Sequence, residues 1–397
     1  MILGPRAAGR WRAAATAAAL TVCATGIVLA PAAPAAAACD NPPRYDNPVT
    51  ETPWPLRRLQ PNLVWPLSQG AGTRVAVIDS GVTVNHPSLA GAVDPGRDFI
   101  DPPTVGQCDQ VAHGSIVAGV IAGRPVGAFS GIAPQARILP IRVLRDTEKT
   151  TDQSIPGNIA DAIKFAADSG VDVINLSLVT PDSAALSGAV QYALSKNVVI
   201  VAAAGNEGGT KQEGSAFPAA YPGVIAVAGI DEEGKHVDSS SSGAFVDVAA
   251  PGANVVGPVP AGGGFAQFQA GGTSFAAAYV SGLAALLRSQ NKSLTPAEVT
   301  FRITSTADHP AEGFNNQVGH GVISPLRAMT TVHEAARPGA GDPAPAALAR
   351  PEPPHDPLGS TRRIAVITGV ALTAITVVIL LSAASVRRAR ALRARMQ

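Results

Sequence analysis

The sequence predicts an α/β fold, in which helices cover both faces of a mostly parallel central sheet. Short runs of β-branched and apolar residues, which are typical of buried strands, recur along the chain. Segments whose apolar residues have helical spacing lie between these runs. Strands that alternate with helices form parallel sheets that are covered on both faces. With 397 residues, the chain is long enough to bury a large core.

The predicted elements follow one another from residue 73 onward. The predicted strands are 73–79, 136–144, 171–179, 198–206, 224–228 and 245–249. The predicted helices are 113–123, 159–168, 189–195 and one that begins near Ser274. Another helix begins at Thr295, because a Thr cap, a Pro in the first turn and a Glu three residues on form a capping box. The elements end near Met329, so we expect one domain over residues 73–330.

The N-terminal residues have the pattern of a secretory signal peptide. Three arginines in the first twelve residues precede an apolar run, 13–30, which small residues follow up to Ala38. We expect cleavage near Ala38, so that residues 1–38 leave the mature chain. The apolar run is long for a signal peptide, and an uncleaved anchor is therefore the alternative. N-terminal sequencing distinguishes the two, because an anchored chain retains Met1.

The C-terminal residues have the pattern of a single membrane span. Residues 364–386 carry no charge, and the run exceeds the roughly 20 residues that a transmembrane helix needs. Five arginines follow in the tail, 387–397, so the positive-inside rule places this tail in the cytoplasm and the main domain outside. A buried core helix is the alternative, which the length and the arginine flanks disfavour. Residues 336–360, rich in Pro, Ala and Gly, are predicted to be a spacer.

Charge and cysteine content limit the possible partners. The formal net charge is +1, so nothing suggests nucleic acid as a partner. Cys23 lies in the predicted signal peptide, which leaves Cys39 and Cys108 as a pair in an exported protein. We therefore expect a disulfide between them. Lipidation of Cys39 is the alternative, although Ala36 stands where a bulky aliphatic residue is usual.

Residues 39–72 are proline-rich and only weakly periodic. We expect an extended arm that lies on the domain, with Trp54 and Trp65 as anchors. A bond from Cys39 to Cys108 would fasten this arm to a distant loop.

A serine at the start of a helix is the main chemical feature of the sequence. Gly271 and Gly272 supply a turn, and Thr273 or Ser274 can cap the helix that follows. Apolar residues at helical spacing after Ser274 predict that this helix is buried and rigid. A hydroxyl there lies near free backbone N–H groups and the positive end of the helix dipole, which favours a nucleophile whose reaction develops negative charge. An ordinary capping serine is the alternative.

Two further residues supply the partners that a nucleophilic serine needs. Asp79 ends a predicted strand, at the sheet edge where α/β folds hold their sites, and His113 opens a predicted helix. A serine needs a base to accept its proton, and the histidine needs a carboxylate to fix its tautomer. Taken singly, Asp79 also fits a turn residue and His113 a packed one. We interpret His86, which precedes a proline, as structural.

Together these residues resemble the subtilisin-like serine peptidases over about residues 64–329, and their order Asp, His, Ser is that of subtilisin. The matching motifs are VIDSG at 77–81, HGS at 113–115, VAG at 117–119, AAGN at 203–206 and GTS at 272–274, with lesser matches at 131–134, 250–252 and 318–321. The resemblance implies a subtilisin-like fold and an endopeptidase. In it, Asp79 orients His113, His113 is the general base and acid, and Ser274 attacks.

The same resemblance implies a role for Asn206, which would donate to the oxyanion together with the backbone N–H of Ser274. In subtilisin, losing that donor lowers the rate by about two to three powers of ten. Ser177, Leu178 and Val179 resemble the edge strand along which an extended peptide substrate pairs. The family implies no cofactor and calcium-independent action, and no clustered acidic loop contradicts this.

Three residues depart from the family pattern. Val179 stands where glycine is usual, so we expect a narrower pocket. Ser115 replaces the usual Thr, and Ala278 stands where a proline usually follows the serine by four residues, so we expect the helix to lack its customary kink. Activity is expected to survive, because the triad and Asn206 are intact.

The terminal segments narrow the resemblance to the mycosins, the membrane-anchored peptidases of type VII secretion systems in actinobacteria. A signal peptide, a short arm with one cysteine, a peptidase domain, a Pro/Ala spacer and one C-terminal span resemble their arrangement. The motif WPL at 65–67 with GAG at 70–72 fits too. Residues 39–72 are too short for the propeptide that assists the folding of secreted subtilisins. The resemblance implies a location in the cell membrane and partners in a type VII secretion complex.

Three functions are compatible with these patterns. The leading hypothesis is a membrane-tethered endopeptidase that processes exported proteins. The alternative is a domain that serves chiefly as a structural component of a secretion complex, and a Ser274→Ala chain that still supports secretion would favour it. A degradative surface protease for nutrients is less favoured, because such an enzyme gains little from a tether.

Overall fold

The computed structural model describes residues 39–146, 155–208, 216–269 and 272–332. They all belong to the first of the chain's two compact units, Met1–His333. The predicted signal peptide, spacer, membrane span and basic tail lie outside the described residues. Within the described part of the chain, no helix is long and apolar enough to cross a membrane.

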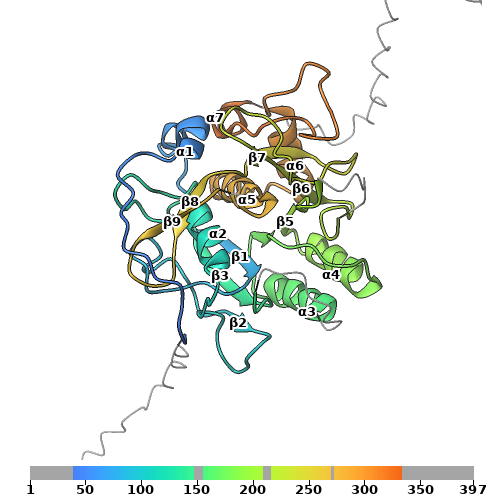
Figure 1. Cartoon of the computed structure of the whole chain (residues 1–397). Helices are drawn as coiled ribbons and strands as arrows, with labels where there is room; N and C mark the ends of the chain where they lie inside the picture. Colours follow the sequence, from blue (N-terminus) through green and yellow to red (C-terminus); the bar gives the residue numbers. More distant parts are fainter. Residues whose placement is uncertain (1–38, 147–154, 209–215, 270–271, 333–397) are drawn as a thin grey trace, which may run out of the picture. The chain divides into compact units, whose positions relative to one another are not determined.

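A parallel sheet of seven strands forms the centre of the described domain (Figure 1). The strands are β1 (Arg74–Asp79), β2 (Arg97–Asp98), β3 (Arg137–Arg142), β4 (Val173–Leu176), β5 (Val199–Ala203), β6 (Val224–Ile230) and β7 (Val248–Pro251). Their order in the sheet is β2-β3-β1-β4-β5-β6-β7. The carboxyl ends of β1, β4 and β5 therefore lie side by side, and the loops that leave them can share one site.

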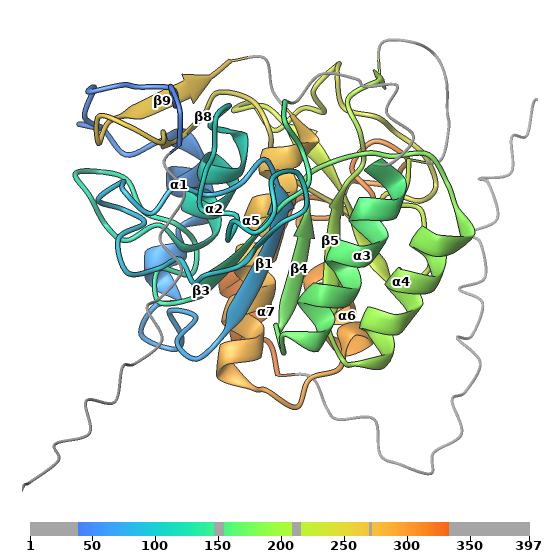
Figure 2. The ribbon, with the colours of Figure 1, turned by 90° about the horizontal axis from the view of Figure 1, so that it is seen from below.

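Helices cover both faces of this sheet (Figure 2). They are α2 (His113–Ala122), α3 (Ile155–Asp168), α4 (Ala184–Ser195) and α5 (Thr273–Gln290). Successive side chains of a strand point to opposite faces. In β1, Val77 packs in the core that contains α2 and α5, whereas Ile78 packs in the core that contains α3 and α4. Strands buried on both faces confirm the predicted fold class.

Helix α5 is buried along almost its whole length, from Thr273 to Arg288. It contacts α2 and strands β4 to β7. The helix also packs closely on the loop between α2 and β3, because a Cβ added at Gly282 would lie only 2.7 Å from the Cβ of Ile132. Each large apolar side chain that the helix buries fully stabilises the fold by roughly 1.5–3 kcal/mol. The first turn of α5 is therefore held rigidly by the rest of the domain.

The sequence pattern predicts an extended arm over residues 39–72, and this prediction is wrong for the second half of the segment. The segment contains the helix α1 (Trp54–Leu59) and the 3₁₀ turn η1 (Pro61–Leu63). Pro55 lies in the first turn of α1, a position that proline favours, and the apolar side chains of the helix face the domain. The proline content that suggests an irregular arm thus also starts a short helix.

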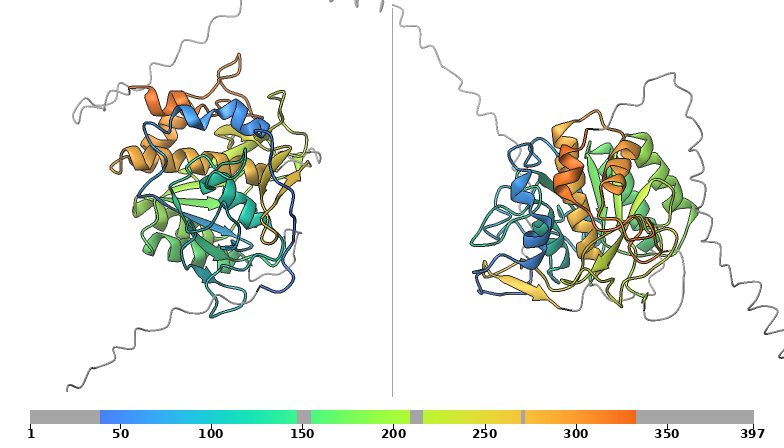
Figure 3. Two further views of the ribbon diagram at one scale, coloured as in Figure 1. Left: turned by 90° about the vertical axis from the view of Figure 1, so that its left-hand side faces the viewer. Right: turned by 90° about the horizontal axis from the view of Figure 1, so that it is seen from above.

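Both predicted anchors of this segment are present. Trp54 Nε1 donates to the Ala253 carbonyl oxygen at 2.9 Å, and Trp65 Nε1 donates to the Ile132 carbonyl oxygen at 3.0 Å. The two views of Figure 3 place the helical part of the segment beside α7 (Pro325–Thr330), which contacts η1. The segment is therefore part of the domain's packing and not a loose extension.

Some elements differ from the predicted pattern. The sequence does not predict β2 or the antiparallel hairpin of β8 (Val255–Pro258) and β9 (Phe265–Phe268), which lies outside the main sheet. The hairpin loop contains Gly262 and Gly263, whose φ angles of 90° and 76° need glycine. The last predicted strand, 245–249, overlaps β7 only at residues 248 and 249, because β7 begins three residues later and ends two residues later than predicted. Helix α6 (Pro296–Ser305) begins with the predicted capping box of Thr295 and Glu298.

Candidate active site

Asp79 ends β1 and is fully buried at the carboxyl edge of the sheet. Its Oδ1 accepts hydrogen bonds from His113 Nδ1 at 2.7 Å and from the backbone N–H of Ser80 at 2.7 Å. The close approach of α2 to β1 requires Gly114, because a Cβ there would lie 2.1 Å from the Gly81 carbonyl oxygen. The HGS sequence thus allows the histidine to reach the aspartate.

His113 is the first residue of α2, and its side chain is 16% exposed. An ionised carboxylate can only accept, so Nδ1 carries the proton in the bond to Asp79, and Nε2 is the free nitrogen of the neutral ring. Burial by itself lowers the pKa of His113. The charge and hydrogen bond of Asp79, with the charge of Asp109, outweigh this effect and hold the pKa above the ordinary value of 6.5. The ring is therefore a stronger base than a free histidine.

Ser274 is the second residue of α5 and is 8% exposed. The ring of its neighbour Phe275 packs beside the His113 ring, with 5.6 Å between the centroids. Helix α5 thus brings Ser274 to the same corner of the domain as the Asp79–His113 pair. Its Oγ donates to the Ser177 carbonyl oxygen at 3.2 Å. Among the described residues, Ser274 and His113 share no hydrogen bond in this side-chain orientation.

The cap of α5 differs from the prediction. Gly272 is the N-cap residue, and neither Thr273 nor Ser274 caps the helix with its side chain. Instead, Thr273 Oγ1 accepts from the Gly205 N–H and donates to Asn206 Oδ1, each at 3.1 Å. The threonine is used to join the start of α5 to the loop after β5, and so it is not free to fold back onto its own helix.

Asn206 is oriented by this contact. The backbone N–H of Thr273 donates to Asn206 Oδ1 at 2.9 Å. A backbone N–H can only donate, so the amide atom that faces it is the oxygen. The NH₂ group lies at the other end of the amide, 3.7 Å from where a Cβ on Gly272 would stand. A Cβ at position 272 would therefore make an ordinary van der Waals contact with this donor.

Residues 177–179 directly follow β4. Ser177 and Leu178 are buried, whereas Val179 is 51% exposed. A Cγ of Val179 lies 3.4 Å from where a Cβ on Gly205 would stand, so its isopropyl group leans over the residue before Asn206. The contact places this side chain beside the loop of Asn206, and the narrowing of the pocket stays a prediction.

The other two departures from the family pattern are accommodated locally. Ser115 Oγ accepts from the Thr83 N–H at 3.0 Å, a bond that a threonine hydroxyl can also make. Ala278 is buried within α5, which runs without a break past it. His86 is buried, and its ring nitrogens bond to Ser88 Oγ and the Gly264 carbonyl oxygen, in agreement with a structural role.

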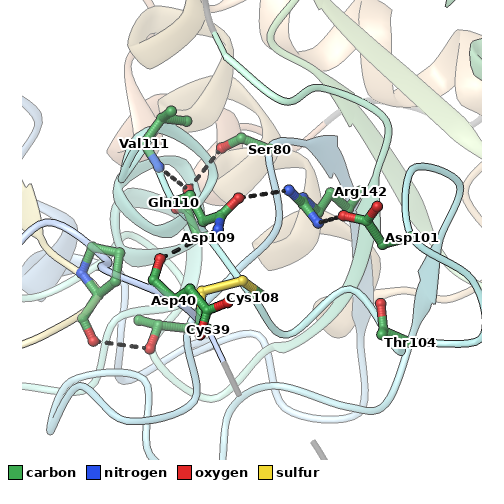
Figure 4. Close-up of a disulfide and its surroundings, with 12 residues drawn as sticks. Cys39, Asp40, Ser80, Asp101, Thr104, Cys108, Asp109, Gln110, Val111 and Arg142 are labelled. Atoms are coloured by element: carbon green, nitrogen blue, oxygen red, sulfur yellow. Dashed lines mark hydrogen bonds and ion pairs between the residues drawn. A yellow bond between two sulfur atoms is a disulfide. The ribbon is translucent and has the colours of Figure 1, made fainter. Parts of the chain in front are cut away.

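Asp109 is a buried carboxylate that the sequence motifs do not single out (Figure 4). Its oxygens accept from Ser80 Oγ at 3.0 Å and from the N–H groups of Ala112 and Ser115 at 2.9 and 2.8 Å. Burial raises the pKa of Asp109, and the hydrogen bonds from Ser115 oppose this rise. The residue binds free N–H groups at the start of the helix that His113 opens. Asp109 stands four residues before His113, whereas the N-cap position of α2 is Ala112, so the capping pattern of the sequence does not single Asp109 out.

Cys39 and Cys108 form the predicted disulfide (Figure 4), with 5.1 Å between their Cα atoms. The bond leaves no free sulfur on Cys39 for the alternative of lipidation. It links the start of the 39–72 segment to the residue before Asp109, and hence to the loop that leads into α2. Within the described ranges, no group of three or more His, Cys, Asp or Glu side chains could hold a metal ion.

The site therefore combines a buried carboxylate, a basic histidine, a serine at a helix start and an oriented amide donor. These are the groups that acyl transfer through a covalent serine intermediate needs.

Comparison with known proteins also indicates a serine peptidase. The model of the Subtilase family matches residues 70–321. Mycosin-1 of Mycobacterium tuberculosis (strain ATCC 25618 / H37Rv) is 37% identical, with 85% of each chain covered. The solved structure of the serine protease MycP1, an essential component of the type VII (ESX-1) secretion system, has a TM-score of 0.66 at 36% identity and covers 74% of this chain and 92% of its own. A chain of an intact ESX-5 inner membrane complex has a TM-score of 0.65 at 30% identity, over 86% and 93%.

Proposed function

This chain belongs to the subtilase family and is a serine-type endopeptidase similar to the mycosins, and from this premise we propose that Asp79, His113 and Ser274 are its catalytic triad. The observation that carries the proposal is the 2.7 Å hydrogen bond from His113 to the buried Asp79, next to the first turn of α5. Asp79 fixes the tautomer that exposes His113 Nε2 and stabilises the charged ring once it has taken a proton.

The reaction begins when the Ser274 hydroxyl turns from Ser177 toward His113, a rotation about one side-chain bond. Oγ attacks the substrate carbonyl carbon while its proton passes to His113 Nε2. The tetrahedral intermediate collapses, the C–N bond breaks, and His113 gives the proton to the leaving amine. Water, deprotonated by His113, then attacks the acyl ester, the bond to Ser274 Oγ breaks, and His113 returns the proton to Oγ as the acid leaves.

Negative charge develops on the substrate oxygen during both attacks. Asn206 Nδ2 and the Ser274 N–H donate to it. The Ser274 N–H is suited to this role because the first turn of a helix has N–H groups without intrahelical acceptors. The Thr273 bond to Asn206 Oδ1 keeps the amide turned for donation, so no reorientation is needed when the charge appears.

The substrate is an extended stretch of an exported protein that pairs along Ser177, Leu178 and Val179. Backbone pairing of this kind binds peptides with modest demands on their side chains. Two of the three residues are buried and hold the segment in place, while Val179 is exposed to the peptide. Since Val179 leans over Gly205, small side chains fit best at the residue whose carbonyl is attacked.

The domain acts outside the membrane as part of a type VII secretion complex. Residues 1–38 direct export, 364–386 anchor the chain, and the arginine-rich tail stays in the cytoplasm. The likeness to a chain of an intact ESX-5 inner membrane complex supports this location.

A chiefly structural role in such a complex is the second candidate. The narrowing by Val179 and the tight fastening of residues 39–72 favour it, because both fit a domain that is built to dock. Secretion by cells that carry Ser274→Ala separates the two candidates: loss of secretion supports the peptidase, and normal secretion supports the structural role.

Labelling with a fluorophosphonate probe tests the triad directly. We expect the full-length wild type to be labelled, Ser274→Ala to remain unlabelled, and Asn206→Ala to be labelled about 10²–10³-fold more slowly. A folded wild type that does not react would contradict the catalytic proposal.

A further inference from the structure

A buried polar cluster crosses the otherwise apolar interface between β4 and α5. Asn175, in β4, and Ser281, in α5, are fully buried, and Ser177 is 4% exposed. Asn175 is flanked in the sheet by Val77 of β1 and Val201 of β5. Polar side chains destabilise such an interior unless they are hydrogen-bonded, so each bond in the cluster has to be accounted for.

The three hydrogen bonds of this cluster run in one direction. Ser177 Oγ lies 2.8 Å from the Ser274 carbonyl oxygen, which can only accept, so the hydroxyl proton of Ser177 points there. Asn175 Nδ2 must then be the group that donates to Ser177 Oγ, at 2.8 Å. Asn175 Oδ1 faces Ser281 Oγ, which donates to it at 2.8 Å. Each of these three bonds therefore has a defined donor and a defined acceptor.

The cluster ends on two atoms of the site. Ser177 donates through its side chain to the backbone oxygen of Ser274, and its own backbone oxygen accepts the Ser274 hydroxyl at 3.2 Å. The two serines are thus joined twice, once through the backbone of the nucleophile and once through its reactive oxygen. Asn175 and Ser281 fix the Ser177 side chain from the side away from Ser274. Ser281 lies about two turns after Ser274 along α5.

We propose that Ser281 and Asn175 are positioning residues, which act through Ser177 to set the place of Ser274 relative to the strand that binds the substrate. This inference rests on the proposed function of Ser274. Two apolar residues of similar size would fill the interface with fewer groups to satisfy, so packing alone does not require the polar chain. Its particular effect is to fix the register between the first turn of α5 and the end of β4.

The test separates positioning from stability. Ser281→Ala removes the last donor and leaves Asn175 Oδ1 without its partner, so both thermal stability and reactivity should fall. Asn175→Leu with Ser281→Ala makes the interface behind Ser177 apolar while Ser177 keeps its bond to the Ser274 carbonyl oxygen, so stability should return toward the wild-type value. We expect the labelling rate at saturating fluorophosphonate to stay about tenfold below wild type in both, since a misplacement of about 1 Å can cost 10²-fold.

Ser88→Ala is the matched control, because it removes an equally buried hydroxyl that bonds to His86 and not to the site. It should lose stability and keep its labelling rate. All rates are measured on full-length protein and corrected for the folded fraction. Wild-type labelling rates in both Ser281→Ala and the double variant would overturn the positioning role and leave the proposed function of Ser274 intact. An unlabelled wild type would contradict the proposed function, and the positioning role with it.

Discussion

His113 acts as a base only while its ring is neutral, so its pKa sets the lower pH limit of reactivity. Asp79 and Asp109 hold that pKa above 6.5 against the opposing effect of burial. We therefore expect fluorophosphonate labelling of Ser274 to rise with pH, through a midpoint above 6.5, to a plateau.

Replacing Asp79 by Asn is the informative variant for this pH profile. It removes the charge that raises the pKa, so the midpoint should move to lower pH, and the plateau should fall by about 10⁴-fold because the wrong tautomer is favoured. A wild-type midpoint below 6.5, or an unmoved midpoint in Asp79→Asn, would argue against His113 as the base.

Val179 is the residue that we expect to restrict the substrate. Val179→Gly removes the isopropyl group that leans over Gly205, and peptides with a large side chain at the cleaved residue should gain in kcat/KM relative to those with alanine. One methylene in a pocket changes discrimination by roughly 10–200-fold, so a gain of at least tenfold is expected. Peptide substrates that differ only at this residue measure it. Val332→Ala, at an exposed valine, is the control and should leave the ratio unchanged.

At the scale of single residues, the sequence predicts the proposed reacting residues better than the residues that orient them through hydrogen bonds. Asp79, His113 and Ser274 stand at the ends of predicted elements, and their chemistry is specific enough to single them out. The orientation of Asn206 depends on Thr273, which lies far along the chain, and the expected cap is wrong for the same reason. Asp109 is recognisable only once its bonds to the start of α2 are seen.

Among the elements, those with long apolar patterns are the predictable ones. The strands and helices of both cores carry enough apolar residues in sequence to reveal their type. Strand β2 has two residues, and α1 has six, too few for a periodic pattern. Local preference, such as that of Pro55 for the first turn of α1, does not stabilise so short an element by itself, and packing against the rest of the domain supplies the remainder.

Asp247, the residue directly before β7, destabilises the fold when its carboxyl group is charged. Asp247 accepts from the Ala226 N–H of β6 at 2.8 Å, but burial raises its pKa to about 6 from 3.8. The folded state therefore holds this proton more tightly than the unfolded chain does. This carboxyl group's contribution to stability is present below about pH 4 and is lost as pH rises to about 6.

Asp247→Asn removes this titration while its side-chain oxygen can still accept from Ala226. Above about pH 6, we expect the free energy of unfolding of the variant to exceed that of the wild type by on the order of 2 kcal/mol. At about pH 4, the two free energies of unfolding should be equal. Denaturant unfolding at the two pH values measures the difference. A constant difference between the two proteins at both pH values would show that the carboxyl group titrates as if it were exposed.

At the scale of the whole molecule, residues 39–72 are joined to the domain by tryptophan anchors and by the Cys39–Cys108 bond. A structural disulfide of this kind persists in oxidising surroundings, which agrees with the export that we propose for the domain. The bond ends beside Asp109, which supports the helix of His113, so the segment is connected to the site through covalent and hydrogen bonds.

The last prediction concerns the anchor. A stop codon after Ser360 removes residues 361–397 and leaves the domain complete. If 364–386 is the span, the truncated chain should leave the membrane fraction and appear outside the cell, still labelled by fluorophosphonate, whereas the full-length chain should resist extraction by salt. Retention of the truncated chain in the membrane would instead assign the anchor to the uncleaved run 13–30. N-terminal sequencing of the released chain decides this independently, since cleavage near Ala38 and anchoring by that run exclude each other.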